Sequence, residues 1–248
     1  MRISYENLID DITSTSMTAL TTASGYPIAN VQDQRLTKKW KSDSSTTQTV
    51  IIDLGSAQAV TAIAIVSHNI ASTATVVVNA NATDVWTAPS VIESLTWNSG
   101  MIIKFISSQS YQYWQFAFSG LTQAVAIGRL WLGTYSQIDP SSTDEFTVTD
   151  IRDDTVTYGK HRQKYASPGV GWRKIDLSFK ANKTTAISVI RSIYSTVGKH
   201  SSFLFANFDS LRDYPLVDPL YGSFSEDIAF AHQGNQKYNY PISITEDL

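Results

Sequence analysis

The sequence lacks cysteine altogether, in a chain of 248 residues. This absence excludes disulfide bonds, thiolate nucleophiles and thiolate zinc ligands. Histidine is scarce as well, and none of its positions has the spacing of a histidine metal motif. The four histidines are His68, His161, His200 and His232. Glycine-rich phosphate loops, dinucleotide fingerprints and nucleophile elbows are also missing, so we expect no cofactor.

Long apolar runs are missing too. No window approaches the about 18 consecutive apolar residues that span a bilayer. Acidic residues (Glu6, Asp10 and Asp11) interrupt the N-terminal segment where a signal peptide would need an apolar core. We expect synthesis and folding in a cytoplasm, without membrane insertion. A protein of this kind that works outside the cell would leave it by assembly into a particle.

Charged residues make up only 17% of the chain, and the formal net charge is −3. No basic face of the kind that binds nucleic acid is present, and the densest basic segment, Arg35–Lys41, is expected to be a solvated loop rather than a phosphate site. Acidic residues occur as sequence neighbours, such as Asp153 with Asp154, which point to opposite faces in a strand. A glycosidase needs two carboxylates that face each other across a cleft, so we expect no enzyme.

The first part of the chain has the pattern of many short strands. Ser, Thr, Ala, Val and Ile dominate it, which favours strands over helices. Turn residues separate the expected strands, which are Thr49–Leu54, Val60–Ser67, Ala74–Asn79, Ser94–Trp97, Met101–Ile106, Tyr113–Phe118 and Ile127–Gly133. Strands that recur at short intervals without a helix period predict an all-β sandwich.

The composition changes near residue 139, where Asp139–Glu145 has the Pro, Ser and Asp content of a linker. We therefore predict two domains, 1–138 and 139–248. The second has one helix at Lys183–Val197, with Asn182 as N-cap and Gly198 as C-terminal stop. Its expected strands are Glu145–Ile151, Thr155–Tyr158, Trp172–Phe179, Ser202–Ala206, Tyr221–Phe230 and Lys237–Thr245. This order predicts an α+β unit in which one helix flanks a sheet or sandwich.

Tryptophans that are exposed stack against sugar rings, and six tryptophans are present. Trp114 and Trp131 lie in expected strands and are assigned to the core, whereas Trp40 lies among lysines in an expected loop. Trp40 is therefore the candidate for glycan stacking, with burial as the alternative. The other candidate rim residues, for a glycan or a partner, are Arg35, Lys38, His68 and Asn69. Asp33 and Asp43 stay open as loop calcium ligands or as solvated acids.

Segments of the first domain resemble the discoidin-type family, which is also called galactose-binding-like. The resemblance covers about residues 25–134 and rests on Pro27–Asn30, on Trp40 before the Ile52–Gly55 segment (IDLG), and on the segments TATVVVNAN, YWQFAFSG and IGRLWLG. The family fold is a jelly-roll type β-sandwich whose variable loops bind glycans or lipid headgroups. Because those loops carry no motif that transfers to this sequence, the resemblance implies the fold and not a site.

The segment that ends in IVSHNI, and much of the second domain, also resemble tail-tip and baseplate (distal-tail-like) proteins of long-tailed bacteriophages. In the second domain the resembling segments are YGKHRQKYASPGVGWRKIDLSFKANKTTAISVIRSIYSTVGKHSSFLFANFDS, YGSFSEDIAF and YNYPISITEDL. The tail-tube fold of that family is a β-sandwich flanked by one helix. Typical distal tail proteins place it first in the chain, whereas it would come second here.

This second resemblance implies a non-enzymatic structural protein of the virion, made in the host cytoplasm and assembled at the tail tip with other tail proteins. The implied assembly is a homo-oligomeric ring, with a hexamer favoured. The polar segment Gly159–Gly171 is interpreted as an inter-subunit arm, with an ordinary hairpin as the alternative. Its candidate contact residues are Lys160, His161, Arg162, Lys164, Tyr165 and Pro168. The alternative function is a carbohydrate-binding module that recognises host-surface glycans.

Overall fold

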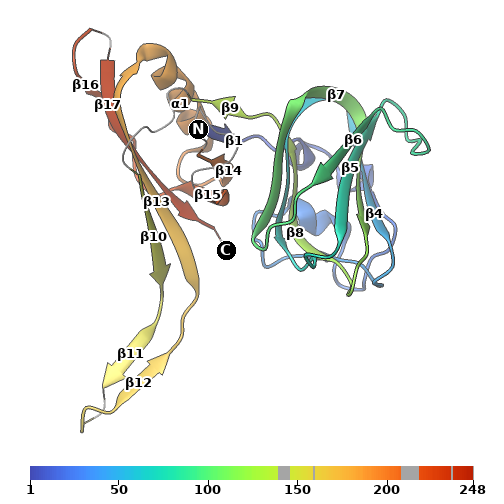
Figure 1. The fold of residues 1–248 in the computed structure, drawn as a ribbon, viewed down its shortest axis with the longest axis horizontal. Coiled ribbons are helices and arrows are strands. Elements are labelled where there is room, and N and C mark those ends of the chain that lie inside the picture. Colours follow the sequence, from blue (N-terminus) through green and yellow to red (C-terminus); the bar gives the residue numbers. More distant parts are fainter. Residues whose placement is uncertain (139–145, 159, 208–217, 236, 248) are drawn as a thin grey trace. The chain divides into compact units, whose positions relative to one another are not determined.

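The computed structural model of the chain describes residues 1–138, 146–158, 160–207, 218–235 and 237–247. The chain divides into two compact units, Arg2–Ser136 and Gln137–Asp247 (Figure 1). Both units are built mainly from strands, and the described residues contain one α-helix. The predicted fold class, mainly β with one flanking helix in the second part, is confirmed. The predicted linker, residues 139–145, lies outside the described residues, so the domain boundary stays a prediction.

The N-terminal unit is a β-sandwich with short 3-10 helices at its start. Its main sheet has the strand order β3-β8-β4-β7-β5-β6, and β2 pairs with β4. The strands of this sheet are β2 (Met17–Ala19), β3 (Trp40–Lys41), β4 (Gln48–His68), β5 (Thr75–Asn81), β6 (Val91–Leu95), β7 (Met101–Ser119) and β8 (Ala126–Gly133). Two short strands, β1 (Arg2–Ser4) and β9 (Ser136–Gln137), lie outside it. The 3-10 helices are η1 (Leu8–Asp11), η2 (Ser14–Ser16) and η3 (Ile28–Gln32).

The two longest strands, β4 and β7, belong to both layers of the sandwich. The start of β4 pairs with β2 and with the end of β7, whereas the end of β4 pairs with β8 and with the start of β7. The ladder between β4 and β7 is irregular between Asp53 and Gln58, where Gly55 has φ +75°. The two strands predicted at 49–54 and 60–67 are therefore one continuous strand, because the irregularity bends it without ending its pairing with β7.

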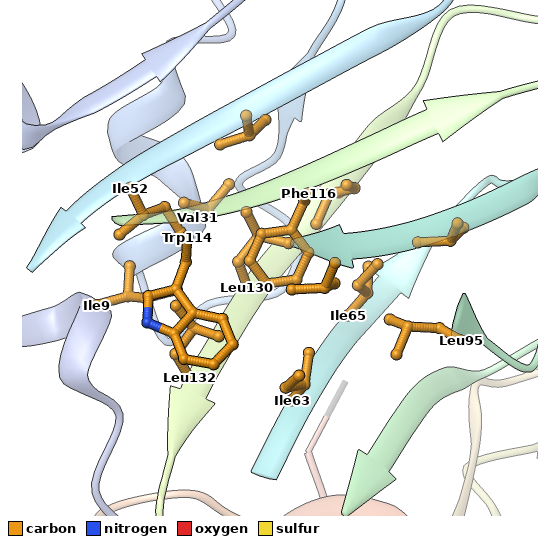
Figure 2. Close-up of a cluster of buried hydrophobic side chains, with 14 of the residues drawn as sticks. Ile9, Val31, Ile52, Ile63, Ile65, Leu95, Trp114, Phe116, Leu130 and Leu132 are labelled. Atoms are coloured by element: carbon orange, nitrogen blue, oxygen red, sulfur yellow. The ribbon is translucent and has the colours of Figure 1, made fainter. Parts of the chain in front are cut away.

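The core of the sandwich lies between these layers. Figure 2 shows labelled side chains from η1, η3, β4, β6, β7 and β8 that point toward one another. On β7, Trp114, Phe116 and Phe118 are fully buried, which confirms the assignment of Trp114 to the core. Large aromatic side chains contribute much of the apolar area that such a core removes from water.

One charged pair is built into the sandwich. The Arg129 side chain on β8 is only 2% exposed and forms an ion pair with Asp10 of η1, whose side chain is 32% exposed. Arg129 also donates to the Gln32 carbonyl oxygen at 2.7 Å and lies over the Trp131 ring at 5.5 Å. These contacts fix the N-terminal 3-10 helices against β8.

The C-terminal unit is an antiparallel sheet with one helix. Its strand order is β10-β13-β17-β15-β14, with β16 on β17, while β11 and β12 form a separate two-stranded ladder. The strands are β10 (Phe146–Arg152), β11 (Thr155–Tyr158), β12 (Lys164–Ser167), β13 (Gly171–Lys183), β14 (Phe203–Ala206), β15 (Leu220–Phe224), β16 (Ala231–His232) and β17 (Lys237–Glu246). The helix α1 (Thr184–Val197) packs on β13 and β17 with buried Ile187, Ile190, Ile193 and Val197.

The predicted C-terminal end of α1 agrees with the structure, whereas the predicted N-cap does not. Gly198 has φ +52° and its amide donates to the Tyr194 carbonyl at 2.8 Å, which confirms it as the C-terminal stop. At the other end, the predicted N-cap Asn182 is wrong, since β13 continues through Lys183 and the helix begins at Thr184. The cross-strand partners of Asn182 and Lys183 on β17 hold these residues in the sheet. The strand predicted at 221–230 ends at Phe224.

Within the described ranges, no helix has the length and the apolar composition that crossing a bilayer requires.

Candidate functional site

Three segments of the N-terminal unit meet where β4 ends and where β7 and β8 begin. They are residues 68–70, 97–98 and 123–126, and we call them the Trp97 loop cluster. The Trp97 indole Nε1–H donates to the Ile70 carbonyl at 2.8 Å, and the His68 ring bonds the Asn98 carbonyl at 2.9 Å. Gln123 donates through Nε2 to the Asn69 carbonyl at 2.9 Å. Because these bonds join loops far apart in sequence, each loop holds the others in place.

His68 has both ring nitrogens occupied. Its Nδ1 accepts the Ile70 amide at 3.1 Å, so Nδ1 carries no proton and the neutral ring carries its proton on Nε2, which then donates to the Asn98 carbonyl. Burial lowers the pKa of the His68 imidazole, and the nearby Lys39 ammonium lowers that pKa further, against the raising effect of the Asn98 bond. His68 therefore acts as a neutral link between two loops.

Asn69 also has a structural role. Its side-chain amide donates to the Ala124 carbonyl at 2.9 Å and accepts the Ala126 amide at 2.7 Å. Its backbone amide donates to the Ala126 carbonyl at 3.2 Å. The structure thus places the predicted rim residues His68 and Asn69 side by side at this end of the sandwich, with their polar atoms committed to holding the loops.

Trp97 keeps part of its indole ring exposed to solvent, although its Nε1–H is hydrogen-bonded. It follows β6, it is 38% exposed, and its indole orientation is set by the bond to Ile70. From the sequence, Trp97 is expected at the end of a strand (Ser94–Trp97), and no pattern there predicts a role for it. The turn-forming residues Asn98, Ser99 and Gly100 directly after it are a signal that could have placed it in a loop.

The prediction that Trp40 stacks on a glycan is wrong. Its side chain is 0% exposed, it pairs with Ile127 of β8, and its Nε1–H faces the Thr22 hydroxyl at 3.3 Å. A side chain without exposed surface cannot offer a ring face to a sugar. The lysines on either side of Trp40 predict an exposed loop, but neighbouring residues of a short strand point to opposite faces, so exposed lysines can flank an inward-facing Trp40.

Arg35 and Lys38 are exposed and lie around Asp33. Arg35 contacts the Asp33 carboxylate at 2.7 Å and Lys38 does so at 3.0 Å, which holds the pKa of that carboxyl well below its usual range. Two cations on one carboxylate leave it poorly suited to calcium. Within the described parts of the chain, no three His, Asp or Glu side chains gather as a metal site would need.

A second tryptophan loop lies between β5 and β6. Trp86 is half-buried and donates to the Asp84 carboxylate at 2.6 Å, only two residues away. The loop is closed further by Asn81, which donates to the Val85 carbonyl at 2.8 Å. Trp86 is thus held by its own loop and is less exposed than Trp97, so it is the weaker candidate for a ligand and a useful control.

The predicted arm residues lie in the C-terminal unit on and around the β11–β12 ladder. The six side chains are exposed, and they are Lys160, His161, Arg162, Lys164, Tyr165 and Pro168. Gly159, the first residue of the predicted arm, lies outside the described residues. The ladder pairs Thr155 with Ser167 and Tyr158 with Lys164, so the segment is a hairpin, and its role in contacts between subunits stays a prediction.

No protein family model matches the chain, and no curated protein is significantly similar to it in sequence. Solved structures similar to it include chitosan-binding module 1 from a chitosanase/glucanase of Paenibacillus sp. IK-5, with 17% identity, TM-score 0.40 and coverage of 52% of this chain and 100% of that chain.

The family 32 carbohydrate-binding module of C. perfringens NanJ, in complex with galactose, has 16% identity, TM-score 0.41 and coverage of 55% and 100%. The lectin domain of lectinolysin, in complex with Lewis B antigen, has 13% identity, TM-score 0.42 and coverage of 51% and 95%. All three structures have low sequence identity to this chain and a TM-score below 0.5.

Proposed function

We propose that the N-terminal sandwich is a non-catalytic carbohydrate-binding module that uses the Trp97 loop cluster. The observation that supports it is the exposed Trp97 indole, held in one orientation by the Ile70 carbonyl. A flat apolar ring fixed before binding loses little conformational entropy when it stacks on the apolar face of a sugar. Asn98 and Gln123 of the same loop cluster are exposed, and the Asn98 Nδ2 and Gln123 Oε1 atoms offer a donor and an acceptor for hydroxyls, since Asn98 Oδ1 and Gln123 Nε2 already bond Gly100 and Asn69.

Isothermal titration calorimetry tests this proposal with chitotriose, galactose and Lewis b, the ligands in the names of the similar structures. We expect binding to at least one of them, and we expect Trp97→Ala to weaken it about tenfold or more, the equivalent of about 1.4 kcal/mol. The matched control is Trp86→Ala, which removes the same ring from the other tryptophan loop and should leave affinity unchanged. Loss of binding in Trp86→Ala alone would contradict the assignment of the site.

We propose, as a second candidate, that the chain is a structural protein of a phage tail tip or baseplate, in which the sandwich contacts the host-surface glycan. The supporting observation is the β11–β12 hairpin, whose described side chains all lie in solvent, as a segment that contacts another subunit would. In this role the chain would reach the virion after synthesis in the host cytoplasm, and it would join other tail proteins in a ring, with a hexamer favoured.

The neighbouring genes test this second candidate. A long tape-measure gene directly upstream is the expected result. A neighbourhood of polysaccharide-degrading enzymes without tail genes would contradict the virion role while leaving glycan binding intact.

A further inference from the structure

The C-terminal sheet ends at β10 with an uncovered apolar face. By register, Phe146 of β10 lies opposite Leu177 and Val148 lies opposite Ile175 on β13, and directly opposite residues share a face of the sheet. Leu177 and Ile175 are buried, whereas Phe146 and Val148 are exposed. The core face of the sheet thus continues onto an edge strand, where nothing in the described chain covers it.

The hairpin formed by β11, β12 and the tip between them continues this exposed surface, and from here on "the arm" means this hairpin. Figure 1 shows β11 and β12 continuing from the β10 and β13 ladder, away from α1. The large exposed side chains of the arm are Val156, Tyr158 and Tyr165, and Tyr158 is 69% exposed. A two-stranded hairpin that buries nothing is marginally stable on its own in water. Its apolar side chains are therefore placed for contact with another surface.

Specific contacts hold the two strands where the β10–β13 ladder passes into the β11–β12 ladder, at residues 152–154 and 169–170. The Asp154 carboxylate accepts the Gly169 amide at 2.7 Å and pairs with Arg152 at 3.2 Å, and the Asp153 amide donates to the Val170 carbonyl at 3.1 Å. A Cβ at Gly169 would lie 1.8 Å from the Asp153 carbonyl oxygen, so only glycine fits there. The direction of the arm is consequently fixed by specific residues.

Charge is segregated along this hairpin. The tip, Lys160–Lys164, contains three basic residues and no acid, whereas the base, Asp150–Asp154, contains three acids and one arginine. At about 3.4 Å per strand residue, four residues separate tip and base by roughly 14 Å, which is longer than the Debye length of about 8 Å at physiological salt. The two charges therefore attract each other weakly within one copy, but they can meet directly between two copies.

We propose that the arm binds a second copy of this chain, with the basic tip of one copy on the acidic base of the next. The contact covers Phe146 and Val148 and brings the exposed arm residues out of water. The attraction of tip for base selects this chain itself as the partner, because each copy carries both halves of the pair. The inference goes beyond glycan binding and deepens the second candidate function by naming the partner of the arm.

Charge reversal and mixing test the proposal by sedimentation velocity of the full chain. Lys160→Glu with Lys164→Glu turns the tip from three positive charges to a net single negative charge. Asp150→Asn with Asp153→Lys turns the base from two net negative charges to one net positive charge. We expect wild type to self-associate, and each reversed variant alone to associate at least about tenfold more weakly. An equimolar mixture of the two variants should associate again, since every tip then meets a base of opposite charge.

The matched control is Asp11→Asn with Asp43→Lys, which changes the net charge as the base variant does but on exposed acids of the N-terminal unit. It should associate like wild type. A wild type that stays monomeric at all concentrations would overturn the inference, as would a mixture that stays dissociated while each variant remains folded by circular dichroism. Neither result decides the virion role, which rests on the gene neighbourhood, so the two proposals fail separately.

Discussion

Removing the Asp10 carboxylate should destabilise the N-terminal sandwich strongly. Asp10→Ala leaves the Arg129 guanidinium, whose side chain is 2% exposed, without its ion-pair partner. Breaking a buried pair from one side costs about 3–5 kcal/mol, and we take the lower end, about 3 kcal/mol, since Asp10 itself is partly exposed and the Gln32 carbonyl remains. For a chain of this size, that loss lowers Tm by about 6–12 °C.

The assay is urea unfolding followed by near-ultraviolet circular dichroism, to which the Trp131 ring beside Arg129 contributes. The matched control is Asp11→Ala, the adjacent exposed acid of η1, which should leave the unfolding free energy within about 0.5 kcal/mol of wild type. The double variant Asp10→Ala with Arg129→Met should recover most of the loss, since the buried guanidinium that lost the Asp10 carboxylate is then removed as well. An Asp10→Ala protein as stable as the Asp11→Ala protein would show that the Asp10 carboxylate does not stabilise the buried Arg129.

Two further predictions concern the sandwich. The pKa of His68 in the folded chain lies below its unfolded value of about 6.5, so the unfolded chain binds the proton more readily, and the free energy of unfolding should fall as pH drops below about 6.5. His68→Asn should flatten that part of the curve of unfolding free energy against pH. An unchanged curve would show that His68 does not cause the fall. Gly133→Ala should lower the free energy of unfolding by about 1–3 kcal/mol in chemical denaturation, since the added Cβ would lie 2.2 Å from the Glu6 carbonyl oxygen. An unchanged free energy of unfolding would show that β8 can shift at Gly133 to make room for the methyl group.

Much of the fold could be read from the sequence because local patterns set it. The expected strand Tyr113–Phe118 placed Trp114 in the core, where it lies, and Gly198 marked the end of α1 because a position with positive φ favours glycine. The N-terminus of the helix could not be read in this way. Asn182 is a good capping residue, but pairing of β13 with β17 holds it in the sheet, and no local pattern reports that pairing.

In the candidate site, too, local sequence predicts where residues lie, whereas their contacts depend on tertiary structure. His68 and Asn69 were found at the rim because they end a strand, but their committed hydrogen bonds depend on Asn98, Ala124 and Ala126, which tertiary structure brings near. Trp40 was misassigned for a related reason. Its burial follows from pairing with β8, whereas its sequence neighbours are the lysines of an exposed segment.

Stacking of a glycan on Trp97 can be observed by an NMR titration of the tryptophan indole N–H signals. Each of the six tryptophans gives one such signal, and Trp97→Phe and Trp86→Phe assign the two that matter. On addition of the ligand found by calorimetry, we expect a saturable shift of the Trp97 signal, with the signals of the buried Trp40 and of Trp86 unchanged. A shift confined to the Trp86 signal, or binding that leaves the Trp97 signal in place, would contradict it.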